Sequence, residues 1–182
     1  DFSTMRAYST FWTDEDTLIA TAGRTRELGI VSGDVNFQAF VTINADTMEA
    51  EQLIREGRDL GYNFDTASLA GEDPETGRLF MPLRDTRGAL NLYSVDPENG
   101  RRMSLVARGD ETTRGWISSP DGRSFVRLSY NNSLNQYQIA IEENDQWRIL
   151  YEARQNLIDM SVAGFTADGQ ALLVRRYTDG PG

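Results

Sequence analysis

Residues 119–126 read Ser-Pro-Asp-Gly-Arg-Ser-Phe-Val, and this stretch is the strongest indication of the fold. Its first four residues are typical of a tight turn, because proline fixes one backbone angle and glycine accepts a positive φ. The last two residues are aromatic and β-branched, which favours a strand. The stretch therefore predicts a short strand that begins directly after a turn.

The same pattern of a turn followed by an apolar strand occurs four times along the chain. The last three copies lie at the spacing of about 40–50 residues that is typical of a β-propeller blade. The interval between the first and second copies is longer and requires an insertion. The copies align at residues 16–20, 77–81, 122–126 and 169–173.

Each repeat continues with a strand in which apolar and polar residues alternate. The alternation is clear in residues 90–95 (Leu-Asn-Leu-Tyr-Ser-Val) and in residues 137–141 (Tyr-Gln-Ile-Ala-Ile). A period of two indicates a strand with one buried face. An acidic turn and a closing strand follow in both repeats. Four short strands joined by hairpin turns make one propeller blade.

We therefore predict an all-β protein, a β-propeller of four-stranded antiparallel blades, of which about three and a half are present. The blades are expected at about residues 5–55, 60–108 and 112–153, with a half blade at 158–178. Because the half blade has two strands where four are expected, we expect residues 1–182 to be a partial propeller domain. The residues predicted to be buried include Leu18, Phe80, Leu92, Phe125, Ile139, Phe165 and Leu172.

Two stretches, residues 48–60 and 148–158, contain many residues that favour helices. Both fall where the repeat requires the outer strand of a blade. Helix propensity is a weak guide that tertiary context commonly overrides. We therefore predict strands in both stretches.

The composition argues against several classes of function. The 182 residues carry a net charge of −10, and all 18 basic residues are arginine. Nucleic-acid backbones and anionic membranes attract basic surfaces, so neither is expected as a partner. No apolar run is long enough to span a bilayer. The chain contains no Cys and no His, which excludes a Ser-His-Asp triad and His-ligated metal sites. We therefore expect no catalytic residue, no metal site and no cofactor in this chain.

Several motifs resemble those of a known family. Residues 116–123 (Trp-Ile-Ser-Ser-Pro-Asp-Gly-Arg) resemble the recurrent Ser-Pro-Asp-Gly turn of the TolB-like and prolyl-oligopeptidase propellers, and residues 165–170 are a weaker copy. Residues 12–18 resemble the opening of a blade in these proteins, and residues 92–100 resemble one of their hairpins. Together the motifs cover nearly the whole chain, which most resembles the amino-terminal propeller of bacterial prolyl-oligopeptidase-family serine peptidases.

The resemblance implies a propeller that lies over an α/β-hydrolase domain and restricts the entry of large substrates. The catalytic Ser, Asp and His of the family belong to that hydrolase domain, and none of them maps onto this chain. The chain has no Gly-x-Ser-x-Gly motif, and its nearest string, residues 29–33, has the wrong spacing.

The resemblance thus predicts a non-catalytic segment that gates and selects peptide substrates. Its partners would be the remainder of the propeller and the hydrolase domain. The alternative is a TolB-like scaffold that binds proteins and has no enzymatic partner domain. A propeller enzyme with its site in the central channel is least favoured, because the chain offers no His as a general base.

The extra length of the first blade falls at residues 23–36, where we expect a long loop between its second and third strands. Long loops on a rigid scaffold often carry recognition, so Arg24, Arg26 and Glu27 are a possible recognition loop. Arg24 and Arg26 could hold a carboxylate bidentately, as in a peptide terminus or an acidic side chain. A solvated surface loop without a function is the more frequent case and the favoured alternative.

Two acidic turns, residues 14–16 and 72–75, offer oxygen ligands of the kind that calcium binds. Acidic turns are common, so plain turns are favoured. Six aromatic residues could form a binding surface, but core packing is the better interpretation, since blades pack through large apolar side chains. The six are Trp12, Trp116, Trp147, Tyr93, Tyr137 and Tyr151.

Overall fold

The computed structural model describes residues 5–27, 34–55, 60–61, 63–143, 146–154 and 160–176. These residues form fifteen strands and no helix, so the described chain contains no helix that could cross a membrane. The prediction of an all-β protein is confirmed for this part of the chain. In the two stretches rich in helix formers, the described residues include β4 (Ala50–Gln52) and most of β13 (Gln146–Arg154), as the repeat predicted. Residues 56–59 and 155–158 of these stretches lie outside the described residues.

The strands form four sheets in which chain neighbours pair in antiparallel fashion. The first sheet has the order β1 (Arg6–Trp12), β2 (Thr17–Glu27), β3 (Asp34–Asn44), β4, and β5 (Asp65–Thr66) pairs in parallel with β3. The second sheet has the order β6 (Gly71–Glu72), β7 (Leu79–Arg84), β8 (Leu90–Val95), β9 (Met103–Ala107). The third sheet consists of β10 (Thr113–Ser118), β11 (Phe125–Asn131), β12 (Gln136–Glu143) and β13, and the fourth of β14 (Met160–Phe165) and β15 (Leu172–Arg176).

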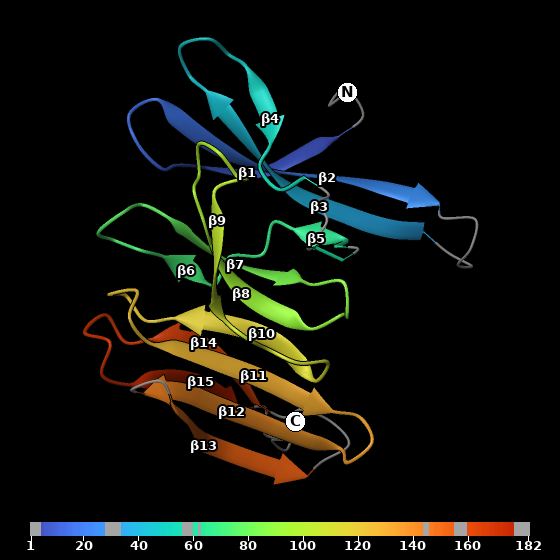
Figure 1. The fold of residues 1–182 in the computed structure, drawn as a ribbon, viewed down its shortest axis with the longest axis vertical. Helices are drawn as coiled ribbons and strands as arrows, with labels where there is room; N and C mark the ends of the chain where they lie inside the picture. Colours follow the sequence, from blue (N-terminus) through green and yellow to red (C-terminus); the bar gives the residue numbers. More distant parts are fainter. Residues whose placement is uncertain are drawn as a thin grey trace, which may run out of the picture.

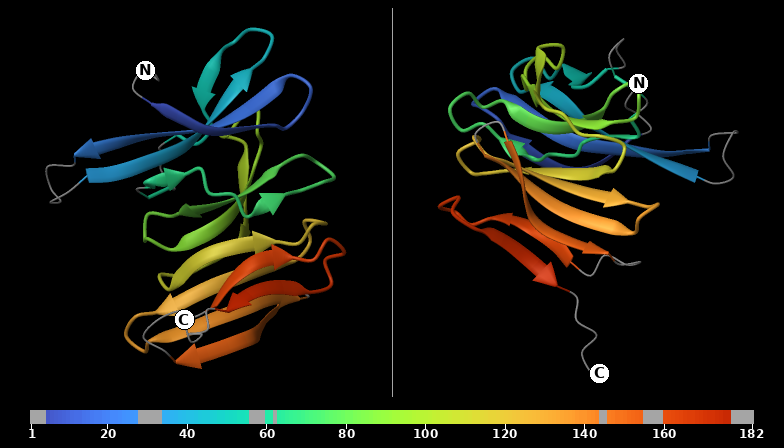
Figure 2. Two further views of the ribbon diagram at one scale, coloured as in Figure 1. Left: turned by 180° about the vertical axis from the view of Figure 1, so that it is seen from behind. Right: turned by 60° about the horizontal axis from the view of Figure 1, so that its bottom comes forward.

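The four sheets follow one another in chain order (Figure 1), and Figure 2 shows them as an open series. Each pair of neighbouring sheets shares a hydrophobic cluster. Ile19 and Phe40 of the first sheet pack with Leu79 and Met81 of the second. The second and third sheets meet through Phe80, Leu92, Trp116 and Phe125. The third and fourth sheets meet through Val126, Tyr137, Ile139, Phe165 and Leu172.

The turn between the first and second strands is closed by an equivalent backbone hydrogen bond in all four sheets. The donor amides and acceptor carbonyls are Thr13 to Thr17 (3.0 Å), Asp73 to Arg78 (2.8 Å), Ser119 to Ser124 (2.8 Å) and Thr166 to Ala171 (2.8 Å). The four acceptor residues occupy equivalent positions, so residues at the same distance after them correspond in the second strands of the four sheets. The sequence alignment, which matched Gly77 with Gly122, is wrong by one residue. The Gly77 amide donates to the carbonyl four residues before it, whereas the Gly122 amide donates to the carbonyl three residues before it.

The turns of the third and fourth sheets match bond for bond. The Ser119 hydroxyl donates to the carboxylate of Asp121, and the Thr166 hydroxyl donates to Asp168 at 2.6 Å. The same hydroxyl oxygens accept the amides of Ser124 and Ala171. The glycines that follow the aspartates have φ angles of 70° and 71°. The weaker sequence copy at residues 165–170 therefore builds the same turn, since threonine supplies the hydroxyl that serine supplies.

Four of the seven residues predicted to be buried are buried, namely Phe80, Leu92, Phe125 and Ile139. Leu18, Phe165 and Leu172 are only half-buried. Leu18 alternates with Ile19, which faces the second sheet, so Leu18 lies on the opposite face of the first sheet. Phe165 and Leu172 face the third sheet, but the fourth sheet has only two described strands, so no third strand flanks them. The face of a strand and the number of strands beside it thus decide how deeply its residues are buried.

The loop expected at residues 23–36 is largely wrong. β2 and β3 pair without interruption from Thr17 and Asn44 to Glu27 and Asp34. β1 pairs with β2 only as far as Gly23, so the two long strands continue beyond it as a ribbon (Figure 1). Residues 28–33 lie outside the described residues. The insertion is a ribbon because each strand satisfies the backbone hydrogen bonds of the other.

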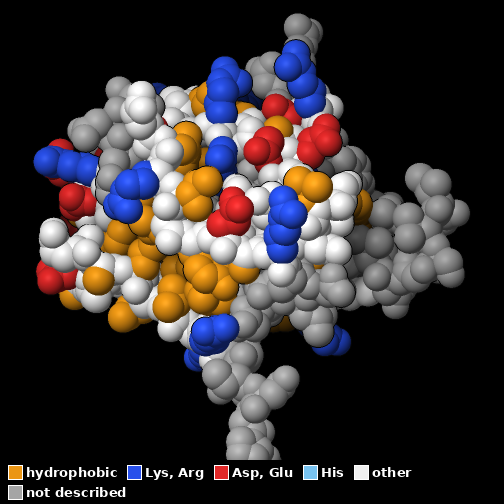
Figure 3. Space-filling view, turned by 90° about the horizontal axis from the view of Figure 1, so that it is seen from below, with side chains coloured by type: hydrophobic (Ala, Val, Ile, Leu, Met, Phe, Trp, Pro, Cys, Tyr) orange, Lys and Arg blue, Asp and Glu red, His pale blue; other side chains and the backbone are white. Residues whose placement is uncertain are grey.

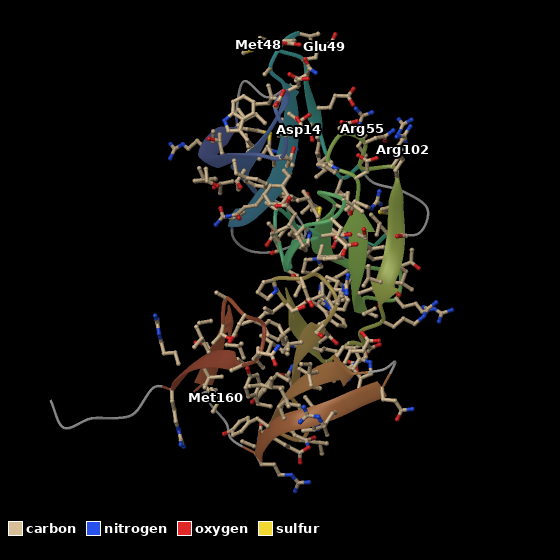
Figure 4. All side chains as sticks on the ribbon, turned by 90° about the vertical axis from the view of Figure 1, so that its left-hand side faces the viewer. Asp14, Met48, Glu49, Arg55, Arg102 and Met160 are labelled. Atoms are coloured by element: carbon tan, nitrogen blue, oxygen red, sulfur yellow. The ribbon has the colours of Figure 1, made fainter. Side chains whose placement is uncertain are left out.

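The turn between β3 and β4 holds Met48 at a φ of 58°, with its side chain 74% exposed at the hairpin tip (Figure 4). Asn44 maintains this turn, because its Oδ1 accepts the amides of Asp46 and Thr47 and its carbonyl accepts the Met48 amide. A left-handed backbone costs a residue with a Cβ about 1–2 kcal/mol. We expect Met48→Gly to raise the free energy of unfolding by about 0.5–1 kcal/mol in urea titrations, since glycine's entropy cost offsets part of the gain.

The control for this substitution is Asn135→Gly, at a φ of 47°. Asparagine tolerates the left-handed region better than methionine does, so the gain at this position should be smaller. A loss of stability in Met48→Gly would show that the methionine side chain contributes more than its backbone strain costs.

Candidate functional site

The first candidate site is the ribbon of β2 and β3, with Arg24 at its base. Arg24 is exposed and lies in register with Phe37. The ring of Phe37 packs against Phe64, with 5.5 Å between centroids, and the Thr25 hydroxyl donates to Asn36 Oδ1 at 2.8 Å. In the described part of the chain, Arg24 forms no ion pair with a carboxylate. The base of the ribbon is therefore fixed, while the guanidinium of Arg24 is accessible.

The other two residues of the predicted recognition loop lie further along the same strand. The backbones of Arg26 and Glu27 pair with Val35 and Asp34. Their side chains lie outside the part of the structure that is described. A grip of Arg24 and Arg26 on one carboxylate therefore stays a prediction, now for a ribbon rather than for a loop.

The second candidate is a cavity of about 420 Å³ where three sheets meet. It lies between β6, β10 and β14, the first strands of the second, third and fourth sheets. Its lining is mostly small, and Glu72 is its only charged residue among those described. The other lining residues are Ala70, Gly71, Ile117, Ser118, Ser119, Pro120, Ala163, Gly164 and Phe165.

Backbone contacts hold the wall of this cavity together. The Ser118 amide donates to the carbonyl of Ala70 at 2.9 Å, which joins the second and third sheets. A Cβ on Gly71 would overlap the Ser118 hydroxyl, so the close approach requires glycine at this position. Sequence reasoning missed this cavity, because its residues come from three sheets; the only available signal was their shared place just before each turn.

The hydroxyl of Ser119 in this wall is occupied by hydrogen bonds within its own turn. Ser119 is buried at 3% exposure, donates to Asp121 and accepts the Ser124 amide. The hydrogen bond from Ser119 is the largest cause of a lowered pKa at Asp121, and the Arg123 amide lowers it further. A carboxylate with a lowered pKa is a weaker base, so it cannot draw the proton from a hydroxyl effectively. Both side chains are therefore engaged in holding the turn.

The two acidic turns use their carboxylates to cap their own backbone. Asp14 Oδ1 accepts the amides of Asp16 at 2.8 Å and Thr17 at 2.6 Å. Asp73 accepts the Thr76 hydroxyl, which is the largest cause of its lowered pKa, and the Glu75 amide. No three acidic side chains gather as a metal site in the described ranges. Both stretches therefore form turns whose carboxylates bind their own backbone.

The aromatic residues divide between core and surface. Trp116 is 4% exposed, and its indole N–H donates to the carbonyl of Leu90 at 2.9 Å. Trp147 packs edge-on against it at 5.7 Å, under the guanidinium of Arg127. The core interpretation is confirmed for Trp116 and for Tyr137, whose pKa burial raises. It is wrong for Trp12, which is 59% exposed. Trp12 is next to Phe11 in the strand, and because Phe11 packs against the core, Trp12 lies on the outer face of the first sheet.

Comparison with known proteins gives no family for this chain. No family model matches it, and no curated protein matches it.

Proposed function

We propose that this chain is a non-catalytic β-propeller segment of a prolyl-oligopeptidase-like serine peptidase. In this role it gates access and selects peptide substrates for an α/β-hydrolase domain. The observation that carries the proposal is one hairpin hydrogen bond repeated in four sheets, three of which also repeat an antiparallel order of four strands. In three of the four sheets the first strands lie together around one cavity.

The arrangement of the first strands supports a radial geometry. In a propeller, the first strand of every blade lies nearest the central channel. β10 approaches both β6 and β14 here, and small residues such as Gly71 and Ala163 leave space between them. A channel of this kind admits an extended peptide and excludes a folded protein by size.

The lack of catalysis in the segment itself follows from its chemistry. The sequence contains no His and no Lys, so neither a Ser-His nor a Ser-Lys pair can form. Ser119, the buried serine beside a carboxylate, is held as a turn cap. The nucleophile, base and oxyanion hole must therefore belong to the hydrolase domain that the proposal requires.

The second candidate is a TolB-like scaffold that binds other proteins and has no enzymatic domain. The ribbon of β2 and β3 favours it, because this ribbon extends past β1 and presents the exposed Arg24 to solvent. Under this alternative, the ribbon would grip an acidic group of the partner.

A fluorophosphonate probe separates the two proposals when it is applied to the full-length protein and to residues 1–182. The peptidase proposal expects labelling of the full-length protein at one serine and cleavage of short peptides, with neither in the segment. Labelling of the segment would contradict the assignment of a non-catalytic role. A full-length protein that is not labelled and does not cleave peptides would support the scaffold.

A further inference from the structure

The outer edge of β15 differs from the corresponding edges in the other three sheets. In those sheets the second strand, which is β2, β7 or β11, pairs on one side with the first strand and on the other with a third strand. Among the described residues, β15 pairs only with β14. Its other side therefore presents a row of backbone groups without a strand partner.

The direction of these groups follows from the turn before the strand. The carbonyl of Ala171 accepts the Thr166 amide, so Ala171 faces β14. Backbone groups point alternately to the two sides of an antiparallel strand. The N–H and C=O groups of Leu172 and Val174 therefore point outward, away from β14.

The side chains of β15 are exposed where their counterparts are buried. Two residues past the hairpin acceptor, Ile19, Phe80 and Val126 are 0%, 5% and 0% exposed. Leu173, in the same position of the fourth sheet, is 52% exposed, and its neighbour Val174 is 51% exposed. Figure 3 shows hydrophobic side chains gathered at the end of the molecule that carries the third and fourth sheets.

The charge of β15 also differs from that of the other second strands. Arg175 stands where the other sheets have Thr21, Pro82 and Leu128, and each of these pairs with a large apolar residue of the third strand. Those partners, Phe40, Leu92 and Ile139, are 0–3% exposed. Arg175 is exposed and has no ion-pair partner in the described part of the chain. A strand paired with β15 therefore meets a cation at this position.

We propose that the outer edge of β15 binds an extended polypeptide segment as an antiparallel third strand, with a carboxylate across from Arg175. Strand addition of this kind gains its affinity from main-chain hydrogen bonds, and an opposite charge directly across the pair adds to it. The inference that a strand binds here rests on the proposed propeller function. The edge of β15 without a described strand partner is an observation that does not depend on that function.

The geometry argues against a second copy of this chain as the occupant. Two copies of β15 paired in antiparallel fashion are related by an axis perpendicular to the sheet, so both third sheets lie on the same face. The third sheet extends two strands, β12 and β13, beyond β11, and these would occupy the space of the other copy's third sheet. An extended segment without a sheet of its own meets no such obstacle.

The test uses the 182-residue chain labelled with ¹⁵N and three synthetic peptides. All three peptides have the sequence of residues 136–143, the third strand of the third sheet. One is unchanged, one carries Ile139→Glu and one carries Ile139→Lys. Position 139 is varied because Ile139 pairs with Leu128, the residue of β11 that corresponds to Arg175. We expect the Glu peptide to shift the amide signals of Leu172 and Val174, and to bind roughly fivefold more tightly than the Lys peptide.

Two variants make the test specific. Arg175→Glu should reverse the preference, so that the Lys peptide binds more tightly than the Glu peptide. Val174→Pro removes an outward N–H while leaving the pairing with β14 in place, and it should abolish binding of all three peptides. If this variant proves unfolded by circular dichroism, the reversal in Arg175→Glu decides alone.

Equal binding of the Glu and Lys peptides, or unchanged binding in Val174→Pro, would overturn the proposal. Concentration-dependent dimerisation that disappears in Val174→Pro would also overturn it, because the occupant would then be a second copy. The probe experiment on the full-length protein is independent of these outcomes, so failure of the peptidase proposal and failure of the strand site remain distinguishable.

Discussion

Gly100→Ala should lower the free energy of unfolding by about 3 kcal/mol, near the upper end of what overpacking costs. Gly100 lies in the turn between β8 and β9, where a Cβ would overlap the backbone carbonyl of Leu53. Leu53 is buried in the cluster between the first and second sheets. Because the overlapping atom is backbone, no side-chain rotation can relieve the clash, and the two sheets must separate locally. Urea unfolding monitored by tryptophan fluorescence measures the loss.

The matched control for this substitution is Gly115→Ala in β10. A Cβ at Gly115 meets only Leu128 Cδ1, at an ordinary contact distance of 3.6 Å. We expect a change within about 0.5 kcal/mol, as for substitutions that create no clash. A loss in Gly100→Ala as small as that in Gly115→Ala would show that the contact between the first two sheets is looser than the structure indicates.

Leu92→Ala should cost about 3 kcal/mol, within the range measured for truncation of buried leucines. Leu92 is 0% exposed and belongs to the cluster of Phe80, Trp116 and Phe125 that joins the second and third sheets. The substitution removes three carbons from a site enclosed by two sheets, and the surrounding rings cannot collapse fully into the space. The loss is measured as a shift of the urea midpoint at an unchanged slope.

Leu173→Ala is the corresponding truncation at the open end of the series. Because Leu173 is 52% exposed, its loss should change the free energy of unfolding by less than about 1 kcal/mol. A loss as large as that of Leu92→Ala would mean that Leu173 is covered in solution.

Addition of the Glu peptide from the strand-binding experiment should raise the free energy of unfolding of the unsubstituted chain and leave that of Val174→Pro unchanged.

The proposed strand-binding site and the proposed propeller involve the same sheet. The first three sheets bury their apolar faces against a following sheet. The fourth sheet presents both an open face at Leu173 and an open edge at Arg175. A segment that pairs with β15 would add the third strand, and a further sheet would then cover Leu173.

The sequence by itself determined the turns and the strand order. Residues 119–126 and 166–171 form their turns through hydrogen bonds among immediate neighbours, with Ser119 and Thr166 as donors and glycine at positive φ. Such turns depend on local chemistry, which a sequence states directly. The alternation in residues 90–95 and 137–141 likewise identified β8 and β12, because period two is a property of the strand alone.

Only the tertiary structure decided which residues meet across the sheets. The insertion at residues 23–36 became a ribbon because β2 and β3 pair with each other, and Trp12 became exposed because no described sheet covers its face. The cavity lined by Gly71, Ser118 and Ala163 and the open edge of β15 exist only once the sheets are in place. Pairing and covering join residues far apart in the chain, whereas propensity and periodicity describe only neighbours, so these features had no local signal.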